Sequence, residues 1–349
     1  MTWMRWILVA LPVSWALAVL HAPPLVVFLV TGLAVIPLAA EMGSATEVLA
    51  DRSGPAVGGL LNATFGNAAE LIIAIVALRA GLLDLVKASL TGSILGNLLL
   101  ILGLSLLAGG LKRPTLTFNR TAAGMSGAML LLAVVGLAIP ALFLSSHPSA
   151  TQETTIHLSE GVAFVLGATY VASLVFALKT HRELFSPERP VAPATGPGGS
   201  VGLAVARLAG ATVLVAVQSE ILVHATEQVV SGIGITETFL GLIVIPLIGN
   251  AAEHATAVVV ARKGETDLAL TIALGSSTQV ALFVAPVLVL AGVILGQPMN
   301  LVFTPFEIVA LGLAALIVTV IALDGESHWF EGVQLLAVYA ILAIAAWFV

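Results

Sequence analysis

The sequence has no cysteine, few charged side chains and few polar aromatic residues. Without cysteine the chain can form no disulfide, thiolate metal site or cysteine nucleophile. Asp, Glu, Lys and Arg make up 9% of the 349 residues, against about 25% in ordinary globular proteins. With only 2 Tyr, 5 Trp and no basic run, the chain has no phosphate-tracking or base-stacking surface. These shortages exclude a soluble enzyme, a nucleic-acid-binding protein and a disordered scaffold.

Apolar residues dominate instead, at 59% of the chain with a mean hydropathy of +1.11. A membrane-spanning helix needs about 20 mostly apolar residues. Long runs that are apolar on nearly every side favour helices over the alternating strands of a barrel. The sequence therefore predicts an all-α integral membrane protein with eleven transmembrane helices. Their expected ranges are 4–20, 24–50, 55–79, 86–109, 119–144, 158–180, 201–230, 236–261, 267–292, 304–323 and 329–348.

The ends of the chain and its basic residues indicate an orientation. The first span resembles a cleaved signal peptide in its length, whereas Trp3 and Trp6 favour an interfacial anchor on a retained helix. With the N-terminus in the cytoplasm and the C-terminus outside, every Lys and Arg except Arg79 and Lys87 falls on the cytoplasmic side. The small size and the lack of a targeting extension favour a prokaryotic plasma membrane, although a vacuolar membrane has similar physics.

The pentapeptide GNAAE occurs twice, at Gly66–Glu70 and at Gly249–Glu253, 183 residues apart. Two shorter matches keep the same order, Gly-Ser at 92–93 and 275–276 and Ala-Thr-Glu at 45–47 and 225–227. Ordered matches of this kind predict a duplicated unit. The expected division is an N-terminal helix at 1–22, a first five-helix repeat at 23–180, a cytoplasmic linker at 181–200 and a second five-helix repeat at 201–349.

An odd number of helices per repeat implies that the second repeat enters the membrane from the opposite side. Such inverted repeats are typical of secondary transporters, whose substrate sites lie near the bilayer midplane. Glu70 and Glu253 fall near the middle of their spans, where a charged side chain costs about 2.5–3.5 kcal/mol. Gly66, Pro246 and Gly249 precede them and predict interrupted helices that expose backbone carbonyls to a cavity.

These two glutamates are the leading candidates for a cation site. Asn67 and Asn250 precede them by three residues, so each amide shares a helix face with a carboxylate. Carboxylate, amide and freed backbone oxygens together suit a hard cation such as Ca²⁺, which takes about 6–8 oxygen ligands. The alternative is that Glu and Asn bond one another and only join helices.

Polar residues on neighbouring spans extend the candidate set. Ser93 and Asn97 lie in the fourth span, and Ser276 and Gln279 lie in the ninth. They are expected to complete the shell of the ion or to hold the glutamates, and ordinary helix packing is the competing interpretation.

Three further titratable residues are candidates for proton transfer or gating. Glu47 and Glu227 fall toward opposite ends of the second and seventh spans, where they would draw in cations, relay protons or simply form a polar rim. His254 follows Glu253 directly and is expected either to relay protons or to pack within the helices.

The segments GNAAELI, GNAAEHATA, TGSILGNLLLILG and ALGSSTQVALF resemble the calcium/proton exchanger (CAX) family of cation/Ca²⁺ antiporters. The resemblance extends over nearly the whole chain. It implies that the two GNAAE motifs form paired ion-binding repeats, with Glu70 and Glu253 as essential carboxylates, and that spans two and seven slide as gates. Many relatives carry an acidic helix between spans six and seven, whereas 181–200 contains only Glu183 and Glu188 as acids.

The resulting expectation is an antiporter that exchanges Ca²⁺ for H⁺ by alternating access and is not an enzyme. Its expected partners are the two transported ions and the lipid bilayer, with no nucleic acid and no cofactor. The sequence leaves open whether the protein forms a homo-oligomer. A sodium-driven Ca²⁺ exchanger and a cation channel are the alternatives. An intramembrane enzyme is disfavoured because no zinc motif, aspartate pair or Ser-His constellation is found in the spans.

Overall fold

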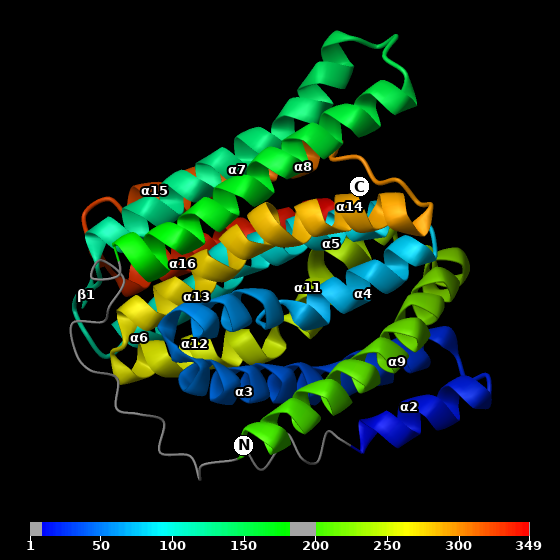
Figure 1. Cartoon of the computed structure of the whole chain (residues 1–349), viewed down its shortest axis with the longest axis horizontal. Coiled ribbons are helices and arrows are strands. Elements are labelled where there is room, and N and C mark those ends of the chain that lie inside the picture. Colours follow the sequence, from blue (N-terminus) through cyan, green and yellow to red (C-terminus); the bar gives the residue numbers. More distant parts are fainter. Residues whose placement is uncertain (1–8, 182–199, 349) are drawn as a thin grey trace. The chain divides into compact units, whose positions relative to one another are not determined.

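The computed structural model describes residues 9–181 and 200–348 and is almost entirely helical (Figure 1). The start of the predicted N-terminal helix and nearly all of the predicted linker lie outside the described residues. The α-helices are α2 (Ala10–Val19), α3 (Pro24–Phe65), α4 (Ala68–Arg79), α5 (Leu83–Leu95), α6 (Leu102–Gly110), α7 (Arg120–Ser146), α8 (Gln152–Val175), α9 (Val201–Ile233), α10 (Glu237–Phe239), α11 (Ile245–Gly249), α12 (Ala251–Lys263), α13 (Thr266–Gln279), α14 (Ala285–Leu295), α15 (Pro305–Ile321) and α16 (Trp329–Trp347). Wider π-helical segments are η1 (Gly96–Ile101), η2 (Phe176–Thr180), η4 (Leu240–Val244) and η5 (Val280–Val284).

Within the described ranges, seven helical segments are long and apolar enough to cross a membrane, and eight if one bent pair is counted as a span. The prediction of a helical membrane protein is confirmed at this level, but the count of eleven is not. The first and tenth predicted spans are represented by the shorter helices α2 and α15. The range 55–79 is divided between the end of α3 and α4, because the helix breaks at the first GNAAE motif.

Breaks in the backbone recur in the two halves of the chain. Gly81 and Gly264 both have positive φ, at 82° and 93°, and α5 and α13 each begin two residues later. Gly54 and Gly234, at φ values of 77° and 78°, interrupt α3 and end α9. Only glycine adopts this conformation at little cost. Segments η1 and η5 then widen the helix at corresponding points, so the order of breaks is the same in both halves.

The chain forms two compact units, and each takes residues from both predicted repeats. The first contains the described parts of Met1–Val76, Val171–Gly234 and Ile248–Ala252. In this unit α9 packs across α3 (Figure 1). Their apolar contact is fully buried at residues such as Ala34, Ala45 and Val215. Arg207 of α9 also donates a hydrogen bond to Glu41 of α3.

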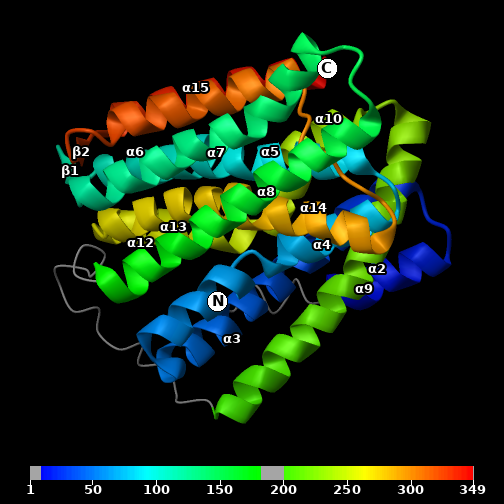
Figure 2. The ribbon, with the colours of Figure 1, turned by 45° about the horizontal axis from the view of Figure 1, so that its top comes forward.

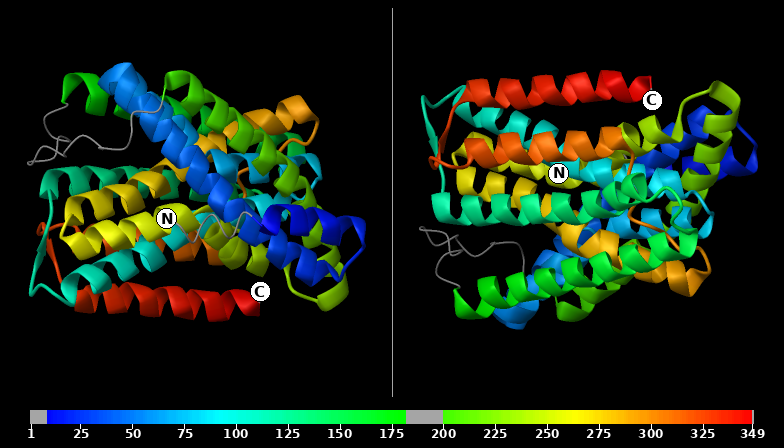
Figure 3. Two further views of the ribbon diagram at one scale, coloured as in Figure 1. Left: turned by 90° about the horizontal axis from the view of Figure 1, so that it is seen from below. Right: turned by 90° about the horizontal axis from the view of Figure 1, so that it is seen from above.

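The second unit contains Ala77–Tyr170, Ile235–Leu247 and the described part of Glu253–Val349. Here α7 packs against α15 (Figure 2) and α16 runs beside α6 (Figure 3). Gly103 allows the close approach of α6 and α16, because a Cβ atom there would lie 3.0 Å from the carbonyl oxygen of Gly332. Small residues of this kind are typical of helix contacts in membranes. The short strands β1 (Leu116–Thr117) and β2 (Glu326–Ser327) pair antiparallel at one end of these helices.

Candidate cation-binding site

The first GNAAE motif lies at a break between two helices. Helix α3 ends at Phe65 and α4 begins at Ala68, so Gly66 and Asn67 form the turn between them. Asn67 is fully buried. Glu70 lies in the first turn of α4, where the free N–H groups and the helix dipole favour a negative charge. The predicted interruption of the helix is therefore found at the motif itself.

The second motif has the same local structure. Helix α11 ends at Gly249, α12 begins at Ala251, and the two segments on either side of the break are bent by 62°. Asn250 is buried at the break, and Glu253 lies in the first turn of α12. Each copy thus places a buried asparagine at a helix break and a glutamate just after it.

The first unit brings the two motifs into contact. Gly249 of the second copy lies against Glu70 of the first, so that a Cβ atom at Gly249 would be 3.1 Å from Glu70 Cγ. Spacing along the sequence does not predict this contact, because the two residues lie 179 positions apart, in different predicted repeats. It shows that the absence of a side chain at Gly249 makes room for the Glu70 carboxylate.

In the second unit Glu253 is held by a serine that the repeat pattern predicts as a site residue. The Ser276 hydroxyl donates a hydrogen bond of 2.8 Å to Glu253 Oε2. Ser276 is buried on α13. Its hydrogen bond therefore ties the Glu253 side chain to α13.

A buried hydrogen bond joins His254 to Asn97, with 3.2 Å between Nε2 and Oδ1. The side-chain nitrogen Nδ2 of Asn97 has no hydrogen-bond partner in the described part of the chain. Asn97 lies in η1, and Gln279 immediately precedes η5. Single π-helical turns are frequent at functional sites, where the extra residue re-aims neighbouring side chains. Ser93 is buried on α5, one turn before Asn97.

The two candidate gate residues lie on the helices of the first unit. Glu47 on α3 and Glu227 on α9 are exposed. His224 Nδ1 is 3.5 Å from Glu227 Oε2. In the described residues, neither glutamate forms a hydrogen bond with a GNAAE motif, so their part in gating stays a prediction.

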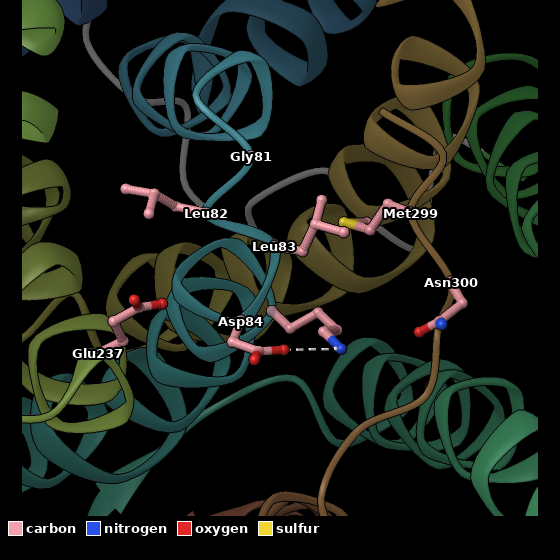
Figure 4. A pocket seen from close by; sticks show the side chains of 8 residues that line it. Gly81, Leu82, Leu83, Asp84, Glu237, Met299 and Asn300 are labelled. Carbon is pink, nitrogen blue, oxygen red and sulfur yellow. Dashed lines mark ion pairs between the residues drawn. The ribbon is translucent and has the colours of Figure 1, made fainter. Parts of the chain in front are cut away.

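No cluster of three His, Asp or Glu side chains able to hold a metal ion is found among residues 9–181 and 200–348. A cavity of about 330 Å³ opens elsewhere in the second unit and contains none of the predicted site residues (Figure 4). Its polar lining includes Glu237, Asn300 and the Asp84–Lys87 ion pair, at 3.1 Å.

Apolar helices that cross a membrane, broken twice at carboxylate-bearing motifs, define a polytopic helical membrane protein. Residues 23–179 and 203–348 match the family described as sodium/calcium exchanger protein. The chain belongs to this family.

Two relatives and one solved structure are similar to the chain over nearly its whole length. The chain is 45% identical to the Ca²⁺/H⁺ antiporter of Synechocystis sp., over 98% of this chain and 96% of the relative. It is 44% identical to the Ca²⁺/H⁺ antiporter ChaA of Bacillus subtilis, over 95% of both chains. The structure of native YfkE superposes with a TM-score of 0.86 at 40% identity, over 99% of this chain and 100% of that chain. The resemblance to calcium/proton exchangers, drawn from the motifs, is confirmed.

Proposed function

We propose that this protein is a secondary active antiporter that exchanges Ca²⁺ for H⁺ across a membrane. The observation that carries the proposal is the pair of glutamates in matching positions, each in the first turn after a helix break. The near full-length identity to proteins named Ca²⁺/H⁺ antiporters supports it. It is a transporter and not an enzyme, because the same carboxylates bind the cargo and no bond in the cargo is broken.

Coupling follows from competition for the two carboxylates. An ionised pair of glutamates attracts a divalent cation, whereas a protonated pair is neutral and has little affinity for it. Ca²⁺ and protons therefore occupy Glu70 and Glu253 alternately. If both carboxyl groups are protonated on the return step, at least two protons move for each Ca²⁺.

The remaining oxygen ligands would come from the other predicted site residues. The proposed shell draws on amide and hydroxyl groups of Asn67, Asn250, Ser93, Asn97, Ser276 and Gln279. Ser276 is already directed at Glu253. The Asn97 oxygen accepts one hydrogen bond from His254, and its second lone pair could bind Ca²⁺ while this bond is kept.

We infer further that the chain comprises an N-terminal helix and two inverted five-helix repeats, eleven spans in all. The matching breaks at Gly54 and Gly234 and at Gly81 and Gly264 support this division. Alternating access would come from movement of α3 and α9, with Glu47 and Glu227 at opposite mouths. The N-terminus would be cytoplasmic and the C-terminus outside, in a bacterial plasma membrane, as the bacterial relatives suggest.

Calcium uptake by proteoliposomes tests this function. Wild type and Glu253→Gln are compared under an imposed pH gradient and then under an imposed Na⁺ gradient. We expect uptake driven by the pH gradient alone in wild type and none in the variant. The family description makes a sodium-driven exchanger the main competitor, and uptake driven only by Na⁺ would establish it. Uptake that responds to neither gradient would indicate a channel or uniporter.

A further inference from the structure

Glu307 is a buried carboxylate that the exchange mechanism does not use. It lies in the first turn of α15 and is only 4% exposed. Its Oε2 atom accepts hydrogen bonds of 2.8 Å from both the backbone N–H and the hydroxyl of Thr304. The Glu307 N–H in turn donates to the Thr304 hydroxyl at 3.2 Å. This capping box needs only one of the two carboxylate oxygens.

The second oxygen reaches another helix. Thr91 of α5 is fully buried and donates its hydroxyl to Glu307 Oε1 at 3.1 Å, across 216 residues of sequence. The ion pairs found in the described ranges do not include Glu307. A buried carboxylate without a cation depends on its hydrogen bonds, so the Thr91 hydroxyl is a strong constraint on where α5 lies.

Helix α5 is also held by neighbouring contacts. Lys87, one turn before Thr91, donates to the carbonyl oxygen of Val302 at 3.2 Å, in the segment that leads into α15. That segment is itself fixed to α8, because Leu301 N–H donates to Ser159 Oγ at 2.9 Å. Elsewhere on α5, a Cβ atom at Gly92 would lie 2.3 Å from the carbonyl oxygen of Leu242, so the helix backbone touches η4 directly.

The residues that follow this anchor are the site residues of α5. Ser93 lies two positions after Thr91, and Asn97 lies six positions after it, just inside the π-helical segment η1. A slide or rotation of α5 would carry both side chains with it. We propose that Glu307 is a positioning residue that acts through Thr91 to hold Ser93 and Asn97 in place for the transported cation. This inference rests on the proposed function.

The anchor is not a product of the internal duplication. At the offset of 183 residues the counterpart of Thr91 is Leu274 of α13, which has no side-chain group to donate. Helix α13 contributes Ser276, which bonds Glu253 directly. The two helices are therefore tied to their surroundings by different contacts, α5 through Thr91 and Glu307 and α13 through Ser276 and Glu253.

Two substitutions at Thr91 distinguish the effect of losing the hydroxyl from the effect of changing the shape of the side chain. Thr91→Val removes the donor and keeps the volume, whereas Thr91→Ser keeps the donor. Thr278→Val is the matched control, since Thr278 is a buried threonine of α13 whose hydroxyl bonds only Leu274 O of its own helix, at 2.8 Å. Each variant is assayed for pH-driven Ca²⁺ uptake against Ca²⁺ concentration, and its Tm is measured in detergent.

We expect Thr91→Val to raise the KM for Ca²⁺ about five- to tenfold, the loss that one buried hydrogen bond accounts for. Thr91→Ser should restore KM to within about twofold of wild type, and Thr278→Val should leave it unchanged. Glu307→Gln keeps an acceptor for the cap and offers its amide N–H to the Thr91 hydroxyl, so the bond becomes neutral and KM should rise by less than in Thr91→Val. The double variant should be no worse than Thr91→Val alone, because both substitutions act on the same contact.

A purely structural role would lower Tm or Vmax and leave KM unchanged in Thr91→Val and Glu307→Gln, and that result would overturn the inference. If Thr91→Val does not fold, Glu307→Gln still decides the question by the same criterion. A wild-type protein without pH-driven uptake would refute the proposed function and this inference together. Normal wild-type uptake with an unchanged KM in the variants would refute the inference alone.

Discussion

Two segments of the second unit, Leu83–Gly110 and Thr266–Leu295, have similar backbone structure but make different side-chain contacts. Each begins two residues after a glycine of positive φ and widens into a π-helical turn partway along. The first is tied to its surroundings at Thr91 and Gly92. The second holds the Glu253 carboxylate directly, through Ser276. The two segments thus have the same order of helix breaks, whereas their side chains make different contacts.

The two GNAAE motifs likewise have the same backbone break but different side-chain contacts. Both break a helix at their Gly-Asn pair, but Leu71 follows the first motif and His254 follows the second. His254 bonds Asn97 of the first segment. The residue that follows the second motif thus bonds a predicted site residue of the first segment.

The largest effect is expected where the repeats are most alike. Glu70→Gln and Glu253→Gln should each abolish pH-driven Ca²⁺ uptake. Each variant keeps only one of the two motif carboxylates, and the proposed exchange of Ca²⁺ for protons needs both. Size-exclusion chromatography should show that both variants stay folded. Glu326→Gln, which alters an exposed carboxylate of β2, serves as the control and should transport normally. Full exchange by either motif variant would show that the motifs are not equivalent.

Matched glycines test the difference in packing between the two segments. A Cβ atom at Gly92 would lie 2.3 Å from a backbone oxygen of η4, whereas at Gly275 nothing lies within 4 Å. Gly92→Ala should therefore destabilise the fold by about 1–3 kcal/mol. Gly275→Ala should stay within about 1 kcal/mol of wild type. Thermal unfolding in detergent measures the stability of both variants. Equal shifts in Tm would show that the two segments do not differ in how closely they are packed.

Ser276→Ala tests how the second segment holds its glutamate. Loss of the 2.8 Å bond to Glu253 should raise the KM for Ca²⁺ about tenfold, as expected for a hydrogen bond to a charged group. The neighbouring Ser277→Ala is the control, because that hydroxyl bonds Ala273 O at 2.8 Å and Ile94 O at 3.5 Å, neither of which belongs to Glu253. If both alanine variants shift KM equally, the contact with Glu253 has no special importance.

The smallest effect is expected at the start of the first segment. The exposed Asp84 pairs with Lys87, and exposed pairs contribute up to about 1 kcal/mol. Asp84→Asn should change Tm little, and added salt should remove even that change. Lys87→Met, which also loses the bond to Val302, should lower Tm further. A larger loss for Asp84→Asn would mean that the ion pair, and not the bond to Val302, anchors α5.

Hydropathy predicts much of this fold because long apolar runs have few alternatives to a helix. The ranges 119–144 and 267–292 correspond to helical segments at Arg120–Ser146 and Thr266–Leu295. Hydropathy does not predict the π-helical turns, since one extra residue per turn leaves no compositional signal. The described part of the first predicted span is a helix of 10 residues, and the rest of that span lies outside the described residues.

The motifs and the helix breaks of the site are readable from the sequence, but its long-range contacts are not. Repetition of GNAAE predicts Glu70 and Glu253 as site residues, and the glycines of the motif predict where the helices break. Contacts such as that of Gly249 with Glu70 join residues that are far apart in the sequence and do not occupy matching positions of the two motifs. The pattern TPFE at 304–307 is a capping-box signal that could have identified the cap at Glu307. Nothing in that pattern points to Thr91.

The most direct test of the exchange mechanism is proton movement driven by Ca²⁺. Proteoliposomes loaded with a pH-sensitive dye receive a Ca²⁺ gradient at zero membrane potential, with wild type, Glu70→Gln or Glu253→Gln in the membrane. Competition of the two ions for both glutamates predicts proton counterflow in wild type and none in either variant. Calcium flux in wild type without proton counterflow, or counterflow that persists in a variant, would contradict it.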